Sequence, residues 1–158
     1  MNSKQLRQCL VEDSMTRHVF GGVMAIDQLP MNPQPDDKQV FIVNTQPASQ
    51  PGAHWLAVYL PPTSQPVEFF DVLGQTPTTY GLPLIQFMNT QGSSYLFQTQ
   101  SLQSQEAITC GHFCLYYLIH RVRGLSLDRI VQDFSPLHVR VNEQMVMEFV
   151  HKYFSIIV

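Results

Sequence analysis

The chain has 158 residues, of which 44% are hydrophobic, 11% aromatic and only 13% charged. This composition is typical of a globular protein with a sizeable core, and it excludes disorder along the whole chain. The formal net charge is −3 and lysine and arginine together number nine, so the chain has no large positive field and we expect no strong nucleic-acid binding. The length fits a single domain that spans residues 1–158.

Cysteine usage and hydropathy indicate the compartment. The three cysteines, Cys9, Cys110 and Cys114, are too few for a disulfide framework and suit a reducing environment. Residues 1–14 carry charges throughout and lack an apolar block of signal-peptide length, and no window approaches 18 continuous apolar residues. We therefore expect a soluble intracellular protein that does not contact a membrane.

The N-terminal region combines a helical pattern with two irregular segments. From a cap at Ser3, apolar residues recur at helical spacing, which predicts a short helix ending near Ser14. Residues 19–30 mix apolar residues with glycines and end in a proline, which predicts a buried connector. The prolines and acidic residues of 31–37 then predict an exposed loop.

The next region has the pattern of a β-sheet. The β-branched run at 39–45 predicts a central strand. Residues 54–60 and 67–74 flank the proline-rich stretch 61–66, and this arrangement predicts a β-hairpin. We also expect a helix over residues 82–90 and a strand over 94–98.

The C-terminal half is helical. Apolar residues at three- and four-residue steps predict a helix over 111–123, with Gly124 as its natural stop. Two more amphipathic helices are expected to begin at the caps Ser126 and Asn142. A helix, a β-hairpin region and then a helical half indicate an α+β fold.

Cys110 stands where a helix begins. The unpaired N–H groups and positive dipole end of a helix N-terminus favour the thiolate, which is the nucleophilic form of cysteine. However, a cysteine in an apolar helical run is more often a small core residue, and Cys114 one turn later has the same pattern. Position alone does not establish a nucleophile.

A nucleophilic cysteine needs a base, and the base needs an orienting partner. His54 lies just before the first hairpin strand and Asp71 at the end of the second, so pairing of the strands brings the two within reach of each other. Taken separately, His54 reads as an exposed loop histidine and Asp71 as a turn residue. Together they predict a His–Asp dyad.

Acyl transfer also requires donors for the oxyanion, commonly a backbone N–H and a side-chain amide. The Cys110 amide fits the first role, and four glutamines upstream compete for the second: Gln98, Gln100, Gln103 and Gln105. The chemistry alone does not choose among them.

Metal binding is not expected. Cys110, His112, Cys114 and His120 cluster in sequence, but each helical residue turns by about 100°, which points His112 away from the two cysteines. The chain has no C-x-x-C pair and no glycine-rich phosphate loop. We interpret the acidic residues Glu12, Asp13, Asp36, Asp37 and Glu143 as surface or capping residues.

Three segments resemble the adenovirus protease (adenain) family, which belongs to the clan that includes the SUMO-deconjugating (Ulp-type) cysteine proteases. The segment "FIVNTQPASQPGAHWLAVYL" resembles the family's strand, loop and His-Trp-led strand, and "VEFFDVLG" resembles the strand with the acidic triad member. The segment "TQSLQSQEAITCGHFCLYYLIH" resembles its glutamine, nucleophile and helix. The order His, acid, Cys also matches and differs from papain, in which the cysteine comes first.

The resemblance implies the fold and the site. It implies a mostly antiparallel central sheet packed against the helix that carries the nucleophile Cys110, with His54 as base and Asp71 as orienting acid. The oxyanion glutamine of the family lies seven positions before the nucleophile, which selects Gln103 and leaves Gln105 as the second choice. Trp55 is expected either to line a substrate channel or to be a core aromatic.

The sequence also departs from the family. Asp71 stands where adenain has glutamate, as in the SUMO-protease branch, and residues 89–100 lack the cysteine that bonds an activating peptide. The resemblance therefore implies a polypeptide substrate and leaves room for an activating peptide without a disulfide. It does not extend to a cofactor, and the acidic chain does not support the DNA cofactor of the viral enzyme.

We therefore predict a monomeric cysteine endopeptidase that cleaves viral or virus-like-element precursors at glycine-containing sites. For a viral protein, the location would be the host nucleus, the cytoplasm or the virion. The enzymatic alternative is deconjugation of ubiquitin or SUMO-like tails, which uses the same four residues. The alternative of another class is a catalytically silent interaction module on the same fold, against which the complete set of His54, Asp71, Gln103 and Cys110 argues.

Overall fold

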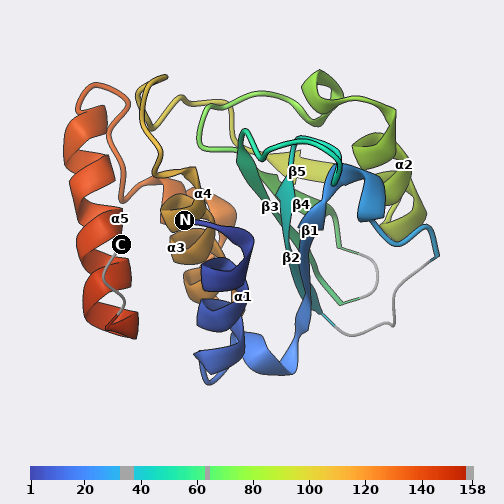
Figure 1. The fold of residues 1–158 in the computed structure, drawn as a ribbon, viewed down its shortest axis with the longest axis horizontal. Helices are drawn as coiled ribbons and strands as arrows, with labels where there is room; N and C mark the ends of the chain where they lie inside the picture. The colour runs from blue at the N-terminus through green and yellow to red at the C-terminus, as the bar shows by residue number, and fades with distance from the viewer. Residues whose placement is uncertain (33–37, 63–64, 156–158) are drawn as a thin grey trace.

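The computed structural model describes residues 1–32, 38–62 and 65–155. A five-stranded sheet forms its centre, with strand order β1-β2-β3-β4-β5 (Figure 1). The strands are β1 (Phe20–Ala25), β2 (Gln39–Asn44), β3 (Trp55–Leu60), β4 (Val67–Phe70) and β5 (Tyr95–Phe97). The predicted loops at 31–37 and 61–66 fall partly outside the described residues.

The sheet is mixed. The pairs β2/β3 and β3/β4 are antiparallel, as the hairpin pattern predicted, whereas β1/β2 and β4/β5 are parallel. The expectation of a mostly antiparallel sheet is thus corrected at both edges. A parallel neighbour requires a crossover connection, and this long-range pairing has no local sequence pattern.

Strand β1 lies where a connector was predicted, and its glycines explain the error. A Cβ atom on Gly21 would lie 2.3 Å from Cζ of Phe41 on β2. Only a residue without a side chain allows the Phe41 ring to lie this close to the β1 backbone. Gly21, which made this segment look like a connector in the sequence, is therefore required by the packing of the sheet.

Helices cover both faces of the sheet. Helices α1 (Ser3–Glu12), α3 (Cys110–Val122), α4 (Leu127–Val131) and α5 (Val139–Phe154) lie on one side, and α2 (Leu82–Gln91) lies on the other (Figure 1). Short 3₁₀ helices occur at η1 (Thr16–His18), η2 (Ile26–Gln28) and η3 (Pro77–Tyr80). No helix of the described ranges is long and apolar enough to cross a membrane.

Alternation along β3 divides the core into two clusters. Ala57 and Tyr59 pack with α1 and α3, whereas Leu56, Val58 and Leu60 pack on the face covered by α2. Because successive side chains of a strand point to opposite faces, one apolar strand serves both clusters. The sheet therefore has an apolar cluster on each of its faces.

Helix α3 is the central helix. All of its residues except His120 and Arg121 are buried, because it packs on β3 and also against α1, α4 and α5. A helix that is apolar all round is typically a core helix. This packing places the first residue of α3, Cys110, at the end of the sheet where β3 begins.

One predicted cap is confirmed and two are revised, the first because the residue that caps α1 is Asn2 and not Ser3. Ser126 caps α4 as expected, with its side chain accepting a hydrogen bond from the amide of Arg129. Asn142 is not a cap, because α5 begins one turn earlier and Asn142 lies buried inside it.

Of the acidic residues interpreted as surface or capping residues, Asp13 is 3% exposed and ends α1 as a capping residue, with its carboxylate accepting a hydrogen bond from the Thr16 amide. The interpretation was wrong for Glu143, which is 7% exposed and lies inside α5.

Candidate active site

The hairpin brings His54 and Asp71 together. His54 immediately precedes β3 and Asp71 immediately follows β4. The antiparallel pairing of these strands therefore puts both residues at the same end of the strand pair. The Nε2 atom of His54 lies 2.7 Å from Oδ1 of Asp71. The predicted dyad is therefore present as a hydrogen-bonded pair.

The Asp71 carboxylate is buried and surrounded by hydrogen-bond donors. Besides His54, Oδ1 accepts a hydrogen bond from the amide of Leu73 at 2.9 Å, and Oδ2 accepts one from the amide of Gln75 at 3.2 Å. The hydroxyl of Tyr80 also donates to Oδ2. These bonds fix the orientation of the carboxylate against the imidazole.

Two residues that hold Asp71 were not assigned this role from the sequence. Tyr80 ends the η3 segment, and no local pattern distinguishes it from other aromatic residues. Gln98, one of the four glutamines considered as oxyanion donors, instead donates its side-chain amide to the backbone carbonyl of Asp71. The role of Gln98 is thus to anchor the strand end that carries the acid.

Cys110 and His54 each shift the pKa of the other. Burial raises the pKa of the Cys110 thiol, but the hydrogen bond with His54, bonds with the Trp55 and Gly111 backbone and the charge of His54 together bring it below its usual value. Burial lowers the pKa of His54, yet hydrogen bonds and charges of Asp71 and Cys110 raise it to about 9. Because Nε2 faces Asp71, Nδ1 is the ring nitrogen left for the thiol. The environment therefore favours a thiolate–imidazolium pair.

Gln103 lies beside this pair. Its side chain is 4% exposed, its Nε2 donates to the carbonyl of Ala107 at 3.1 Å, and its Oε1 accepts from the Thr109 hydroxyl at 2.9 Å. One hydrogen of the amide remains for another acceptor. By contrast, Gln100 and Gln105 are exposed.

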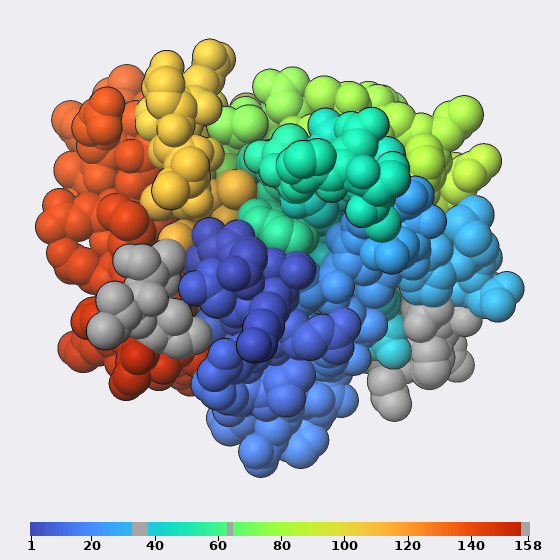
Figure 2. All heavy atoms as spheres, viewed as in Figure 1, coloured from blue at the N-terminus to red at the C-terminus, as the bar shows by residue number. Residues whose placement is uncertain are grey.

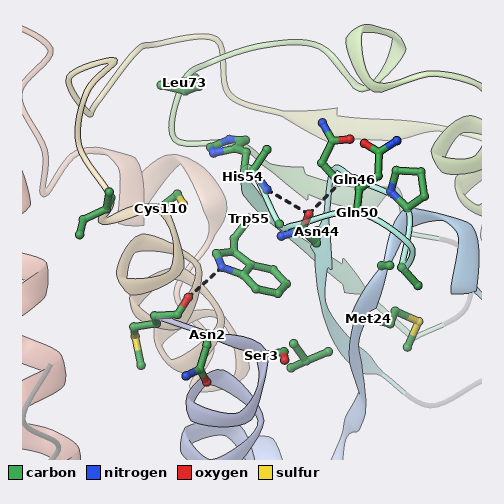
Figure 3. Close-up of a pocket in the computed structure, with 18 of the residues that line it drawn as sticks. Asn2, Ser3, Met24, Asn44, Gln46, Gln50, His54, Trp55, Leu73 and Cys110 are labelled. Atoms are coloured by element: carbon green, nitrogen blue, oxygen red, sulfur yellow. Dashed lines mark hydrogen bonds between the residues drawn. The ribbon is translucent and has the colours of Figure 1, made fainter.

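A cavity of about 710 Å³ opens onto Cys110 and His54 (Figure 3), and Gln103 also lines it. Met24 and Asn44, from β1 and β2, lie across it from Cys110. None of the described residues that line it is an aspartate, glutamate, lysine or arginine. Among the described residues, the lining offers amide groups and apolar surface, and its ionisable side chains are those of Cys110 and His54.

Trp55 has both of the predicted environments. Its indole packs against the core cluster on the α3 side of the sheet, and its Nε1 donates to the carbonyl of Met1 at 3.1 Å. It also lines the cavity next to His54 (Figure 3). A Cβ on Gly111 would lie 3.4 Å from Trp55 Cδ1, so the start of α3 packs closely on the ring.

The remaining sulfur and imidazole groups are separate from this arrangement. Cys9 and Cys114 are buried, and burial raises the pKa of each thiol, that of Cys9 to about 12. His112 is 3% exposed, and burial lowers its pKa to about 4. Within the described ranges, no three histidine, cysteine or acidic side chains are grouped so as to hold a metal ion.

Comparison with known proteins decides the family. Residues 22–123 match the sequence profile of the adenovirus endoprotease. The chain belongs to the adenovirus endoprotease family. The match covers His54, Asp71, Gln103 and Cys110, and it includes all five strands except the first two residues of β1.

Individual relatives agree with this family. The chain is 34% identical over 94 residues to the protease of snake adenovirus serotype 1, an alignment that covers 52% of this chain and 47% of the relative. It is also 34% identical over 95 residues to the protease of ovine adenovirus D serotype 7, covering 51% and 45%. The chain thus spans about half the length of these relatives.

A solved structure shows the same fold. The ASFV pS273R protease matches with a TM-score of 0.59 at 14% identity, over 82% of this chain and 60% of that protein. The predicted α+β protease fold is therefore confirmed, with a mixed sheet.

Proposed function

We propose that the chain is a cysteine peptidase in which Cys110 attacks the peptide carbonyl. The observation that carries this proposal is the contact of the buried His54–Asp71 pair, 2.7 Å apart, with a thiol of lowered pKa at the start of α3. A structural cysteine has no need of a histidine partner, and Cys9 and Cys114 have raised pKa values. Membership of the endoprotease family supports the same reaction.

The reaction follows from the roles of these groups. The Cys110 thiolate forms a bond to the carbonyl carbon, and the carbonyl oxygen becomes an oxyanion that accepts hydrogen bonds from the free Gln103 amide hydrogen and the Cys110 N–H. His54 protonates the departing amine as the C–N bond breaks, which leaves a thioester. Water activated by His54 then hydrolyses the thioester, and Asp71 keeps the imidazole in the required tautomer throughout.

The substrate is proposed to be a polypeptide with glycine near the scissile bond, such as a viral or virus-like precursor. The support is the family and the lining of the cavity, in which none of the described residues is an aspartate, glutamate, lysine or arginine that would pair with a charged substrate side chain. Deconjugation of a ubiquitin-like tail would use the same four residues, and the test below separates the two.

We further propose that residues 1–158 act as one monomeric domain in a reducing compartment. The two ends of the chain both pack on α3, since α1 and α5 contact it, and all three cysteines are free. An activating peptide would have to bind without the disulfide of the viral enzyme, because residues 89–100 contain no cysteine.

The test is labelling and cleavage with matched variants. The purified chain is incubated with a peptide vinyl sulfone ending in Gly-Gly, with a fluorogenic peptide containing internal Gly-Gly, and with a ubiquitin-like fusion. We expect labelling and cleavage of the internal peptide by the wild type and by Cys9→Ala, and neither by Cys110→Ala.

Other outcomes have defined meanings. If Cys9→Ala abolishes labelling and Cys110→Ala retains it, the nucleophile is wrongly assigned. Cleavage of the ubiquitin-like fusion with no cleavage of the internal peptide would replace the endopeptidase by a deconjugating enzyme. A folded wild-type chain that reacts with none of the three probes supports the silent interaction module.

A further inference from the structure

Gln103 lies in a segment without helix or strand. Residues 98–109 connect β5 to α3 outside any helix or strand, and the Leu102 amide anchors them beyond β4 by donating to the Val72 carbonyl at 2.8 Å. An oxyanion donor acts only when its hydrogen is held about 2.7–3.1 Å from the developing charge. The position of Gln103 therefore depends on what holds the residues on either side of it.

Helix α5 holds both neighbours of Gln103. Asn142 Nδ2 donates to the carbonyl of Leu102 at 3.0 Å. Glu143 Oε1 accepts two hydrogen bonds from Ser104, one from its amide and one from its hydroxyl, each at 2.8 Å. In Figure 2 the yellow residues of this segment lie directly against the red-orange end of α5.

The two α5 residues are buried polar groups, which require a reason. Asn142 is 3% exposed and Glu143 7% exposed. The other buried residues of this helix, Val146 and Val150, are apolar. Burial of a polar side chain costs free energy unless its hydrogen bonds are satisfied. Asn142 forms two hydrogen bonds with the Ser135 backbone, and its bond to Leu102 and both Glu143 bonds go to the residues directly before and after Gln103.

We propose that Asn142 and Glu143 are positioning residues for the oxyanion site. They act on the reaction through the backbone at residues 102 and 104, and neither of them lines the cavity. This inference rests on the proposed peptidase function. Two residues in the first half of α5, a helix outside the family match at residues 22–123, thereby support the oxyanion site.

The test separates oxyanion stabilisation from thiolate formation. Hydrolysis of a Gly-Gly peptide and binding of a peptide aldehyde both create an oxyanion. Alkylation of Cys110 by iodoacetamide displaces iodide and creates none, so it reports only the Cys110–His54 pair. A variant that merely unfolds the site would impair all three measurements.

We expect Glu143→Ala to lower kcat by about 10- to 100-fold with KM nearly unchanged, since a displacement of about 1 Å has an effect of this size. The inhibition constant of the aldehyde should rise by a similar factor, while the rate and pH profile of alkylation stay the same. Glu143→Gln keeps an oxygen acceptor for Ser104 and should recover most of the activity.

The matched control is Glu148→Ala, because Glu148 is an exposed glutamate of the same helix that accepts a hydrogen bond from Gln144 at 2.7 Å. It should leave kcat unchanged. In a chain that already carries Gln103→Ala, adding Glu143→Ala should lower kcat by no more than about 2-fold further. A residue that acts through Gln103 loses most of its effect on kcat once the Gln103 side chain is absent. If Glu143→Ala does not fold, Ser104→Ala removes one of the two bonds and is measured instead.

Three results would overturn the inference alone while the wild type is active. The first is a folded Glu143→Ala chain with the same kcat as Glu148→Ala. The second is a Glu143→Ala chain that loses hydrolysis and alkylation equally. The third is a double variant in which the effects of Glu143→Ala and Gln103→Ala on kcat are additive. A wild-type chain that neither hydrolyses the peptide nor binds the aldehyde would overturn the peptidase proposal, and this inference with it.

Discussion

The imidazole of His54 lies 2.7 Å from the carboxylate of Asp71, although 17 residues separate them in the chain. One residue stands before β3 and the other after β4, so the hairpin itself creates the pair. The nucleophile Cys110 comes from a later part of the chain and reaches the pair through packing of α3 on β3. The following predictions test each part of this arrangement.

Cys110 should be the cysteine that reacts selectively with iodoacetamide at pH 7. Interaction with His54 lowers its pKa despite burial, whereas burial and the charge of Glu12 raise the pKa of Cys9 to about 12. Cys114 is also buried, with a raised pKa. Mass spectrometry of peptides after brief alkylation would measure this, with the denatured chain as a control in which all three cysteines react. Modification of Cys9 before Cys110 in the folded chain contradicts the assignment.

Hydrolysis and alkylation should respond differently to high pH. The pKa of His54 is raised to about 9, so imidazolium is present below that pH and is lost as the pH rises through it. Hydrolysis needs this proton for the leaving amine and should decline above about pH 9, whereas alkylation needs only the thiolate and should persist. Asp71→Asn removes the charge that helps raise the His54 pKa and should move the decline to lower pH. Parallel pH profiles for the two reactions would argue against the ion pair.

Replacement of Gln103 by alanine should lower kcat by about 10²- to 10³-fold, the usual effect of losing one oxyanion donor. Alkylation of Cys110 should remain at the wild-type rate, because it forms no oxyanion. Steady-state kinetics with the fluorogenic peptide would measure the change, and Gln100→Ala, at an exposed glutamine outside the cavity, is the control. If Gln105→Ala rather than Gln103→Ala has the large effect, the second choice was correct.

Tyr80→Phe should reduce kcat/KM by about 3- to 10-fold, or about 0.7–1.4 kcal/mol, because it removes one donor from the Asp71 carboxylate. The amides of Leu73 and Gln75 still hold Asp71, so the loss should be partial. Tyr95→Phe removes a hydroxyl outside the site and serves as the control. Equal kcat/KM for the two variants would remove Tyr80 from the site.

The buried ion pair between Glu68 and Arg121 should matter for stability and not for chemistry. Arg121 binds both carboxylate oxygens of Glu68, at 2.8 and 2.9 Å, and Glu68 is 5% exposed. Arg121→Met leaves the acid without its cation and should lower the free energy of unfolding by about 3–5 kcal/mol, measured by urea denaturation. Adding Glu68→Gln should recover part of this loss. The exposed Arg129 pairs with Asp133, and Arg129→Met should change stability little.

Much of the fold was predictable because its patterns are local. The apolar spacing of α1 and α3 and the alternation of the β3/β4 hairpin depend on residues close in sequence, and these elements were predicted nearly at their observed bounds. The same locality predicted that His54 and Asp71 meet, since a hairpin brings together residues that are near in the chain. Among the four glutamines, in contrast, local sequence made no choice.

Tertiary structure decided the features whose partners are distant. Gln98 and Gln103 have similar local sequences, yet one anchors Asp71 and the other faces the cavity. The sequence predicted Glu143 to be a surface or capping residue, because its partner Ser104 lies 39 positions away. The sequence by itself determined most of the helices and strands, β1 excepted, and the order of the catalytic candidates, because neighbouring residues carry that information. Which polar groups are buried together, and therefore which ones hold the site, was decided only when β3, α3 and α5 packed against one another.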